Sequence, residues 1–418
     1  MDLLNQSVLV LGAGVSGKAA AKMLRSHNAD VRVYDDNDNN QVNLDGVKLC
    51  VVSPGVPISH KIISMLRKRQ VKIMSELELG ASVMECDIIA ITGTNGKTTT
   101  TLLVAEMLKN AGFNAIKMGN IGEPVTTYAP DIKEEDIAVI EVSSFQLETT
   151  NYFKPKVAAA LNVAPDHLDR HGSYQEYIRQ KLRLFQDMDI SDRAVINHDY
   201  PLLKEFSRGL KIPVTPFSMK EKVKGVFVEN GNIYYEGYVT SIEDIAMKER
   251  CNIENALAAL AICLPYGVPP KAARDTLLYF TPPEFRMSDR GVRWNKRIIN
   301  DSKGTNIHST LAALKSLTGD TALILGGSDK GEDFTKLFNN LPACVRYILV
   351  TGENAPEIMS AADKCKFNMI MEFKQLSDCV EYVKQLNVIN VLFSPASASF
   401  DRYRDYKERG KAFDDLLC

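Results

Sequence analysis

The segment Ile88-Ile-Ala-Ile-Thr-Gly-Thr-Asn-Gly-Lys-Thr-Thr-Thr-Thr-Leu-Leu103 contains the features from which we interpret the rest of the chain. Its apolar start, Ile88 to Ile91, predicts a buried strand, and apolar residues at helical spacing from Thr98 to Ala111 predict a helix. Gly93 and Gly96 permit positive φ angles and close approach of the backbone to a ligand. A strand, a glycine loop and a helix N-terminus in this order present backbone N–H groups to a phosphate. We therefore predict a nucleotide-phosphate site in an α/β fold.

The residues that follow the glycines strengthen this interpretation. Lys97 can reach the outer phosphates of a nucleotide, and Thr98 can offer its hydroxyl to a magnesium ion. The loop departs from the usual phosphate-loop pattern, because Ile91 stands where that pattern has its first glycine. A glycine turn that only caps an ordinary helix is the structural alternative, and the Lys-Thr pair favours the nucleotide site.

Composition and charge narrow the classes of function. A chain of 418 residues is too long for one compact core and predicts about three domains. The net charge is −2 and the charged residues are spread along the chain, which argues against a nucleic-acid-binding surface or an anionic-membrane anchor. The start of the chain lacks the basic segment of a secretory signal, and no apolar run is long enough to span a bilayer. The eight cysteines show no metal-site spacing, which is typical of reduced thiols in a cytosol. We expect a cytoplasmic protein whose partners are small molecules.

The first segment contains a second glycine turn, Gly12-Ala-Gly-Val-Ser-Gly17. A strand from Ser7 to Leu11 precedes it, a helix from Lys18 to Ser26 follows it, and the next strand ends at Asp35 and Asp36. This order is typical of a dinucleotide-binding fold. The G-x-G-x-x-G pattern is weak by itself, so a dinucleotide site and a tight turn that only packs the helix on the strand both stay open.

The central segment places polar residues at the ends of apolar runs. The predicted strand Ile137 to Glu141 ends in a carboxylate, beside the expected position of the phosphate loop in a parallel sheet. We interpret Glu141 as a metal ligand in preference to a buried glutamate held by backbone donors. After another buried strand, the loop Ala164 to Gly172 carries two histidines, two aspartates and an arginine. Such a loop is either catalytic or a polar surface turn.

A predicted amphipathic helix follows, from Ser173 to Asp187. Ser173 is its expected N-cap, with Glu176 completing a capping box. Tyr177 and Lys181 fall on its inward face by four-residue spacing. From composition alone, we expect the stem of Lys181 to pack and its ammonium group to reach water.

The remaining chain contains an apolar helix and a third alternating segment. Asn252 and Asn255 lie in the first turn of the helix Cys251 to Cys263, where they could simply be caps. Beyond Pro283, polar loops repeatedly follow the C-terminal ends of predicted strands, which is the edge where open α/β sheets bind ligands.

Nine segments, spread over the whole chain, resemble the Mur ligase family, the enzymes that add amino acids to the peptidoglycan precursor. In the family's order they are Thr92 to Thr98, Gly119 to Gly122, Glu141 to Glu148, Asp166 to His171, Asn252 to Asn255, Phe285-Arg286, Asp301 to Asn306, Gly326 to Lys330 and Ser394 to Phe400. The strings Glu141-Val-Ser-Ser-Phe-Gln-Leu and Ser394-Pro-Ala-Ser-Ala-Ser resemble the D-glutamate-adding member. The Asp-Asn-Pro-Arg box of the diaminopimelate-adding member is absent from the sequence.

The resemblance implies an α/β protein of three domains. They are a Rossmann-like UDP-substrate-binding domain at 1–87, a central mononucleotide-binding ATPase domain with a mainly parallel sheet at 88–282, and a Rossmann-like amino-acid-binding domain at 283–418. It implies an ATP-dependent acid–amino-acid ligase that adds D-glutamate to UDP-N-acetylmuramoyl-L-alanine through an acyl phosphate. We expect a monomer that acts in cytoplasmic peptidoglycan precursor synthesis, and therefore in cell wall biogenesis, cell shape and cell division.

Three alternatives stay open. The first is another Mur-family or folylpolyglutamate-type amino-acid ligase. The second is a nucleotide-dependent binding protein without amide chemistry. The third is an NAD-dependent dehydrogenase, which would leave the phosphate loop and Glu141 unexplained.

The resemblance also implies the roles of individual residues. ATP would be held by Gly93, Thr94, Asn95, Gly96, Lys97, Thr98, Thr99, Asn252, Asn255, Arg286 and Asp301. The UDP-linked substrate would be held by Val15, Ser16, Asp35, Asp36, Asn120, Ser143 and His167. D-Glutamate would be held by Thr305, Lys330, Ser399 and Phe400. Two Mg²⁺ ions would be bound through Thr98, Glu141, His167 and a carbamate formed from carbon dioxide on Lys181. Lys97, Glu141, His167 and Lys181 would be catalytic, and Asp36 departs from the hydroxyl residue expected at its position.

Overall fold

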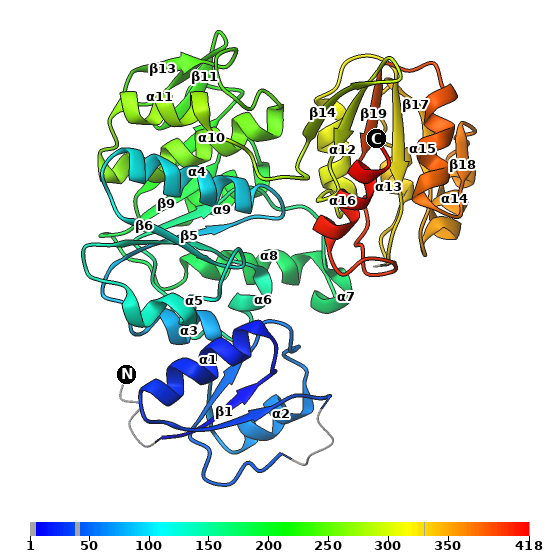
Figure 1. Cartoon of the computed structure of the whole chain (residues 1–418). Helices are drawn as coiled ribbons and strands as arrows, with labels where there is room; N and C mark the ends of the chain where they lie inside the picture. Colours follow the sequence, from blue (N-terminus) through cyan, green and yellow to red (C-terminus); the bar gives the residue numbers. More distant parts are fainter. Residues whose placement is uncertain (1–5, 38–41, 330, 418) are drawn as a thin grey trace. The chain divides into compact units, whose positions relative to one another are not determined.

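The computed structural model describes residues 6–37, 42–329 and 331–417, and these form α/β layers around three mainly parallel sheets (Figure 1). Two compact units contain them. The first unit comprises residues 1–163, 170–246 and 254–280, and the second comprises 164–169, 247–253 and 281–418. The predicted α/β class is confirmed. The domain boundaries at 87/88 and 282/283 stay a prediction, although the second sheet begins at Asp87 and the third at Ser288.

The first sheet is wholly parallel and holds the second glycine turn. Its order is β2 (Asp30–Tyr34), β1 (Ser7–Leu11), β3 (Leu49–Val52) and β4 (Lys72–Ser75). Its helices are α1 (Val15–Ser26), α2 (Lys61–Lys68) and α3 (Glu76–Ala81). Helix α1 begins three residues before the predicted Lys18, because the turn winds directly into the helix after the extended residue Gly14.

Close backbone packing explains the last glycine of this turn. A side-chain carbon at Gly17 would lie 1.8 Å from the carbonyl oxygen of Gly12, which is far inside van der Waals contact. Gly12 itself has a φ of +97°, in the left-handed region that favours glycine. A side-chain carbon at Gly14, in contrast, would meet no atom within 4 Å.

The second sheet carries the phosphate loop. Its order is β13 (Tyr238–Ser241), β12 (Asn232–Tyr234), β11 (Val226–Glu229), β10 (Val214–Ser218), β9 (Arg193–Asn197), β8 (Val157–Ala160), β5 (Asp87–Thr92), β7 (Ile137–Glu141) and β6 (Ala115–Gly119). The pairings are parallel except at the β11–β12 and β12–β13 hairpins. Strand β5 lies between β8 and β7, so their carboxyl ends share one edge.

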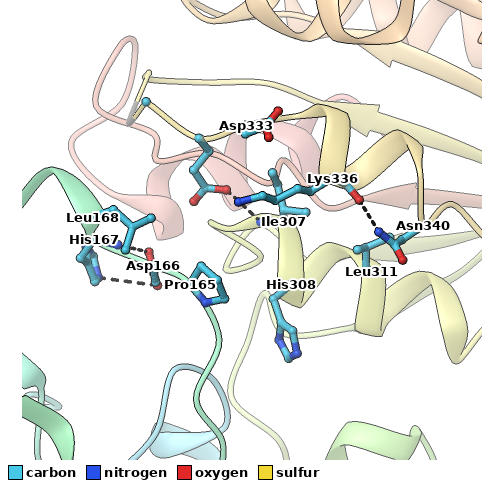
Figure 2. Close-up of a pocket in the computed structure, with 12 residues that line it drawn as sticks. Pro165, Asp166, His167, Leu168, Ile307, His308, Leu311, Asp333, Lys336 and Asn340 are labelled. Atoms are coloured by element: carbon cyan, nitrogen blue, oxygen red, sulfur yellow. Dashed lines mark hydrogen bonds and ion pairs between the residues drawn. The ribbon is translucent and has the colours of Figure 1, made fainter. Parts of the chain in front are cut away.

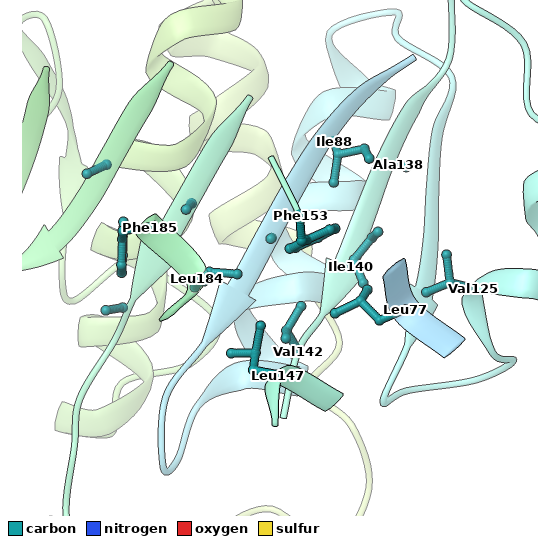
Figure 3. Close-up of a cluster of buried hydrophobic side chains, with 14 of the residues drawn as sticks. Leu77, Ile88, Val125, Ala138, Ile140, Val142, Leu147, Phe153, Leu184 and Phe185 are labelled. Atoms are coloured by element: carbon teal, nitrogen blue, oxygen red, sulfur yellow. The ribbon is translucent and has the colours of Figure 1, made fainter. Parts of the chain in front are cut away.

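One apolar core joins this sheet to elements of the first sheet (Figure 3). Leu77 of α3 and Val125 of α5 (Val125–Tyr128) lie in the same buried cluster as Ile88, Ile140 and Phe153. Burying such side chains contributes roughly 1.5–3 kcal/mol each. This shared core accounts for the grouping of both sheets in one compact unit.

Further helices flank the second sheet. They are α4 (Lys97–Asn110), α6 (Ser144–Leu147), α7 (Leu168–His171), α8 (Tyr174–Leu182), α9 (Pro201–Arg208), α10 (Arg250–Cys263) and α11 (Pro270–Tyr279). Ser173 caps α8 as predicted, by accepting a hydrogen bond from the Glu176 N–H. The capping box predicted for Glu176 is wrong, because its carboxylate instead accepts hydrogen bonds from Arg179 and Gln180 in the next turn. The helix also ends at Leu182 and tightens into a 3₁₀ turn at Arg183–Phe185.

The third sheet belongs to the second unit. Its order is β14 (Ser288–Arg293), β15 (Lys296–Asn300), β19 (Asn390–Phe393), β16 (Thr321–Leu325), β17 (Val345–Val350) and β18 (Ile370–Glu372). Among the described strands of this sheet, β14 and β15 pair antiparallel as a hairpin, and the other neighbours pair parallel. Helices α12 (Ile307–Lys315), α13 (Thr335–Phe338), α14 (Ala355–Lys364), α15 (Leu376–Gln385) and α16 (Tyr406–Asp415) accompany it. Within the described part of the chain, no helix has the length and apolar character needed to cross a membrane.

The contrast between Gly17 and Gly14 gives a test of the first sheet. We expect Gly17→Ala to lower the thermal unfolding midpoint by several degrees, because a clash with backbone costs about 1–3 kcal/mol. Gly14→Ala is the matched control and should shift the midpoint by no more than about one or two degrees. Calorimetry of both variants checks this, and equal midpoints would contradict the close packing of turn and helix.

Candidate active site

The phosphate loop joins β5 to the N-terminus of α4. Gly96 is the N-cap of α4, has a φ of +85° and provides no side-chain cap. The first N–H groups of a helix have no acceptor within the helix itself. A side-chain carbon at Gly96 would also lie 2.3 Å from Oδ1 of Asn255. The glycine therefore adds no side chain in front of the helix N-terminus, an arrangement typical of phosphate-binding loops in nucleotide sites.

Asn162 fixes the shape of this loop. Its side chain accepts a hydrogen bond from Asn95 N (2.9 Å) and donates one to Asn95 O (3.0 Å), while its carbonyl accepts from Thr94 N (3.1 Å). Asn162 was missed in the sequence analysis. Its position two residues after β8, at the carboxyl edge beside β5, is the signal that could have identified it.

Two lysines converge on one carbonyl oxygen in this loop. Lys97 Nζ donates to Gly93 O (2.7 Å), and Lys181 Nζ donates to the same oxygen (2.8 Å). Lys181 is only 2% exposed, and its ammonium group lies over the ring of Tyr177 at 4.6 Å. The inward face predicted for α8 is confirmed, whereas the expectation that the ammonium group reaches water is wrong. The helix is packed so closely against the loop that the side chain ends at a backbone acceptor.

Glu141 lies at the carboxyl end of β7, in register with Ile91 of β5. Its side chain is buried, and Oε1 accepts a hydrogen bond from Asn120 Nδ2 at 2.7 Å. Oε2 is also buried and accepts no hydrogen bond from the described residues. A buried carboxylate oxygen without a donor is costly unless a cation meets it. The geometry thus fits a hard metal ion that takes oxygen ligands.

The described residues do not form a complete protein cage for a metal. Among the residues that the structure describes, no three His, Cys, Asp or Glu side chains are grouped to hold an ion. Mg²⁺ usually keeps several waters and takes oxygens from substrate phosphates, so one carboxylate and one hydroxyl beside a phosphate loop suffice. Glu141 and Thr98 therefore fit Mg²⁺ in the presence of a nucleotide.

The second glycine turn carries the residues expected to bind the UDP end. Asp35 Oδ2 accepts a hydrogen bond from Ala13 N at 2.7 Å, and this backbone donor holds the pKa of Asp35 below its usual value. Val15 is 70% exposed, and Ser16 beside it is half-buried. Asp36 pairs with His60 Nε2 at 3.0 Å, a partner that the sequence analysis missed.

Ser143 and Asn120 have structural partners. Ser143 caps α6 and forms a reciprocal capping box with Gln146, which places its hydroxyl at the helix N-terminus. Asn120 donates to Glu141 twice, from Nδ2 to the carboxylate and from its backbone N–H to the carbonyl oxygen (2.9 Å). Both lie at the carboxyl edge of the second sheet, as expected for substrate-binding positions.

The second unit holds His167 and the residues expected to bind the ribose and the amino acid. His167 has a φ of +53°, and its ring lies 3.7 Å from Asp166 Oδ2, which also accepts from Asn306 Nδ2 (3.1 Å). Burial raises the pKa of Asp301 to about 7, and Ser394 Oγ donates to its carboxylate at 2.7 Å. Ser399 is buried, whereas Phe400 is 73% exposed.

The other predicted residues are placed as follows. Arg286 contributes a positive charge near Asp301, Thr305 is half-buried in the loop before α12, and Asn252 donates to Glu249 Oε2 at 3.1 Å. Lys330 lies outside the described residues. Gly93 to Thr99, Glu141, Lys181 and Asn255 belong to the first unit, and His167, Asn252, Arg286, Asp301, Thr305, Ser399 and Phe400 belong to the second.

A cavity of about 290 Å³ lies within the second unit (Figure 2). It is lined by Pro165, Asp166, His167, Leu168, Ile307, His308, Leu311, Gly331, Glu332, Asp333, Lys336 and Asn340. Burial lowers the pKa of His308, so its ring is neutral near pH 7. His308 and Lys336 carry no recognisable motif in the sequence and were not predicted as site residues. Their closeness in the chain to the predicted residues Thr305 and Lys330 is the one sequence feature that could have pointed to them.

The fold and the loop together define a multidomain α/β protein with a mononucleotide-phosphate site. Similarity to known families identifies the class of protein more closely. The Mur ligase middle domain matches residues 91–263, and the alanine dehydrogenase/PNT C-terminal domain matches residues 3–118. The chain is 36% identical to the UDP-N-acetylmuramoylalanine–D-glutamate ligases of Caldicellulosiruptor saccharolyticus and Alkaliphilus oremlandii, over 100% of this chain and 99% of each relative. The chain belongs to the Mur ligase family, and this membership implies ATP and Mg²⁺.

Solved structures show the same fold. The UDP-N-acetylmuramate–alanine ligase of Thermotoga maritima has a TM-score of 0.62 at 18% identity, covering 98% of this chain and 99% of its own. A MurF ligase from Thermotoga maritima, solved with ADP, has a TM-score of 0.63 at 16% identity, covering 99% and 96%. At these identities the likeness concerns the fold alone.

The orphan oxygen of Glu141 leads to a mutational test. We expect Glu141→Gln to leave the thermal midpoint within a few degrees of wild type and to lower ATP-dependent phosphate release about a hundredfold or more, since metal charge neutralisation is worth several kcal/mol. Glu106→Gln, at an exposed position on α4, is the matched control and should keep full activity. A folded Glu141→Gln enzyme with a near-normal rate at ordinary Mg²⁺ would show that Glu141 is structural.

Proposed function

We propose that this protein is an ATP-dependent ligase that joins D-glutamate to the alanyl carboxylate of UDP-N-acetylmuramoyl-L-alanine. The observation that carries the proposal is the 36% identity, over the whole chain, to relatives named as D-glutamate-adding ligases. The phosphate loop and Glu141 at one sheet edge support it, because they provide what phosphoryl transfer requires. Phosphoryl transfer depends mainly on positioning and on charge neutralisation.

The chemistry follows from the poor reactivity of a carboxylate toward an amine. An oxygen of the alanyl carboxylate attacks the γ-phosphorus of ATP, the bond to the β–γ bridging oxygen breaks, and ADP leaves. The resulting acyl phosphate has a good leaving group on its carbonyl carbon. The D-glutamate amine attacks that carbon, loses a proton and displaces inorganic phosphate, which leaves an amide.

The protein's own groups would orient these reactants. Backbone N–H groups of the loop and the Lys97 ammonium would hold the β- and γ-phosphates, and Thr98 and Glu141 would hold Mg²⁺. Mg²⁺, when bound, supplies positive charge to the phosphoryl oxygens. His167 would join a second metal site. The ATP, UDP and D-glutamate positions predicted from the sequence complete the proposal, with Lys330 beside Thr305, Ser399 and Phe400 around the amino acid.

A carbamate on Lys181 is part of the proposal. The ammonium groups of Lys181 and Lys97 share Gly93 O, so two positive charges meet where the site must also receive Mg²⁺. Addition of carbon dioxide to the neutral Lys181 amine, with loss of a proton, replaces one of these charges by an anion with carboxylate-like oxygens. Such oxygens suit hard cations. The buried position of the side chain would hold the group in place.

We place this activity in the cytoplasm, in peptidoglycan precursor synthesis that serves cell shape and division, and we propose a monomer. We also propose that residues 1–87, 88–282 and 283–418 bind the UDP-linked substrate, ATP and the amino acid, respectively. Other Mur-family and folylpolyglutamate-type ligases are the nearest alternatives.

The match of residues 3–118 to an alanine dehydrogenase domain favours one alternative from another class, NAD binding at the second glycine turn. Both kinds of site place a diphosphate at a helix N-terminus, so the turn alone does not discriminate between them. Calorimetric titration with NAD and with UDP separates them. Saturable NAD binding without any UDP-linked ligand would favour the dehydrogenase interpretation.

Amino-acid specificity is the direct test of the proposal. We expect D-glutamate to support phosphate release from ATP in the presence of UDP-N-acetylmuramoyl-L-alanine. L-Glutamate, D-aspartate and diaminopimelate should be slower by about a hundredfold or more, because buried polar groups built for one ligand reject analogues that leave them unpaired. A lysine and hydroxyls suit a free dicarboxylate. Comparable turnover with L-glutamate would refute the assignment.

The carbamate is tested by deleting its amine. We expect Lys181→Ala to lower the rate about a hundredfold or more, since a metal ligand is lost. Acetate or formate should restore part of the activity by filling the space that the side chain leaves. Lys109→Ala, at an exposed position on α4, should be fully active with or without the added acids. Full activity of Lys181→Ala without any added carboxylate would end the hypothesis.

A further inference from the structure

We propose that Arg170 is a positioning residue, which holds the backbone of the Ser53–Pro57 loop against the second glycine turn and so orients the UDP end of the substrate. The role of that turn rests on the proposed function. The contacts of Arg170 described below all lie within the first unit.

The guanidinium group of Arg170 uses its N–H groups on three partners. Nη1 donates to Gly55 O (3.1 Å), and Nη2 donates to Val56 O (2.9 Å). Nε donates to both carboxylate oxygens of Glu148 (3.2 Å each), and Nη2 donates to Glu148 Oε2 (2.6 Å). The group also lies over the Phe145 ring at 4.3 Å. This planar fork fixes two successive carbonyls of one loop, a geometry that the single point charge of a lysine cannot reproduce.

The loop that Arg170 holds forms a wall of the glycine turn. Ser53 N donates to Leu11 O (2.9 Å), and Ser53 Oγ donates to Gly12 O (3.0 Å). A side-chain carbon at Gly12 would lie 2.9 Å from Ser53 Cβ and 3.0 Å from Val56 Cγ2. The loop therefore touches the turn where the diphosphate would bind. Any displacement of the loop backbone moves the wall of that site.

The other side of Arg170 is anchored in a buried network. Glu148 is 6% exposed and lies 3.4 Å from His171 Nδ1, while His171 Nε2 lies 3.0 Å from Ser144 Oγ. Burial lowers the pKa of His171, so the ring is neutral near pH 7 and Arg170 supplies the charge that balances Glu148. The His171 ring lies 5.3 Å from that of Tyr177, whose hydroxyl is 3.1 Å from Thr94 Oγ1. Glu148, His171 and Tyr177 thus connect Arg170 to the phosphate loop of the second sheet.

This arrangement explains why the loop needs an external clamp. Gly55 and Pro57 are exposed, and Gly55 has open space around its α-carbon. Two carbonyl contacts from a half-buried guanidinium group that Glu148 holds in place select one backbone conformation. If the competent conformation is populated only in part, the apparent affinity for a ligand falls by that fraction. The role of Arg170 is therefore pre-organisation of the UDP site.

The test measures UDP binding by calorimetry and steady-state kinetics for each substrate. We expect Arg170→Ala to weaken UDP binding about tenfold or more, as a partly populated binding conformation requires. The KM for UDP-N-acetylmuramoyl-L-alanine should rise by a similar factor, with the KM for D-glutamate within about twofold and kcat within about threefold. Arg170→Lys should not restore UDP affinity, and guanidinium added at low millimolar concentration should restore part of it in Arg170→Ala.

Two controls make the outcome decisive. Arg179→Ala removes an exposed arginine whose partner is Glu176 on the same helix, and it should change none of these values. Thermal midpoints show whether each variant is folded, and Glu148→Gln, which keeps the shape of its side chain, should weaken UDP binding in the same direction by a smaller factor. Unchanged UDP affinity in Arg170→Ala, full rescue by lysine, or equal rises in the KM of UDP-substrate and D-glutamate would overturn the inference. Because UDP binding requires no turnover, failure of the ligase assay with wild type would count against the proposed function and not against the role of Arg170.

Discussion

The carbonyl oxygen of Gly93 is the acceptor on which the phosphate site depends, because Lys97 and Lys181 both donate to it. One of these lysines comes from the helix that follows the loop, and the other comes from a helix that lies more than 80 residues later in the chain. The two ammonium groups therefore lie close together beside the N-terminus of α4, whose N–H groups also favour anions. The site is therefore built to be completed by negative groups. Nucleotide phosphates and a carbamate are the groups we propose.

The parallel order of the second sheet places a negative charge, the Glu141 carboxylate, at the same edge as the two lysines. Strands β8, β5 and β7 end together, which brings Asn162, the loop and Glu141 to one edge. Asn162 shapes the loop backbone, and Glu141 presents one buried oxygen that no described residue satisfies. The same topology that buries the apolar strands thus places positive and negative groups on neighbouring strand ends. A cation between them would resolve the unfavourable burial of the carboxylate.

The second glycine turn, Gly12 to Gly17, is supported by elements far from it in sequence. Ser53 bonds to the turn itself, and Arg170 bonds to the loop that contains Ser53. Arg170 lies three residues after His167, so the segment that carries the proposed metal ligand also carries the clamp of the proposed UDP site. Glu148 and His171 keep the guanidinium group in its place from the other side.

The sequence by itself determined the periodic elements and the loops between them. The strand–glycine–helix order at Ile88 to Ala111 and the buried strand ending at Glu141 were both predictable, since apolar periodicity and turn residues act locally. Family resemblance added the site residues, whose roles stay predictions. Only the tertiary structure decided the destination of each long side chain. Lys181 turns to a backbone carbonyl and not to water, and Arg170 binds a loop more than a hundred residues earlier. These contacts depend on which strand ends and helices become neighbours, and no local pattern of residues encodes that neighbourhood.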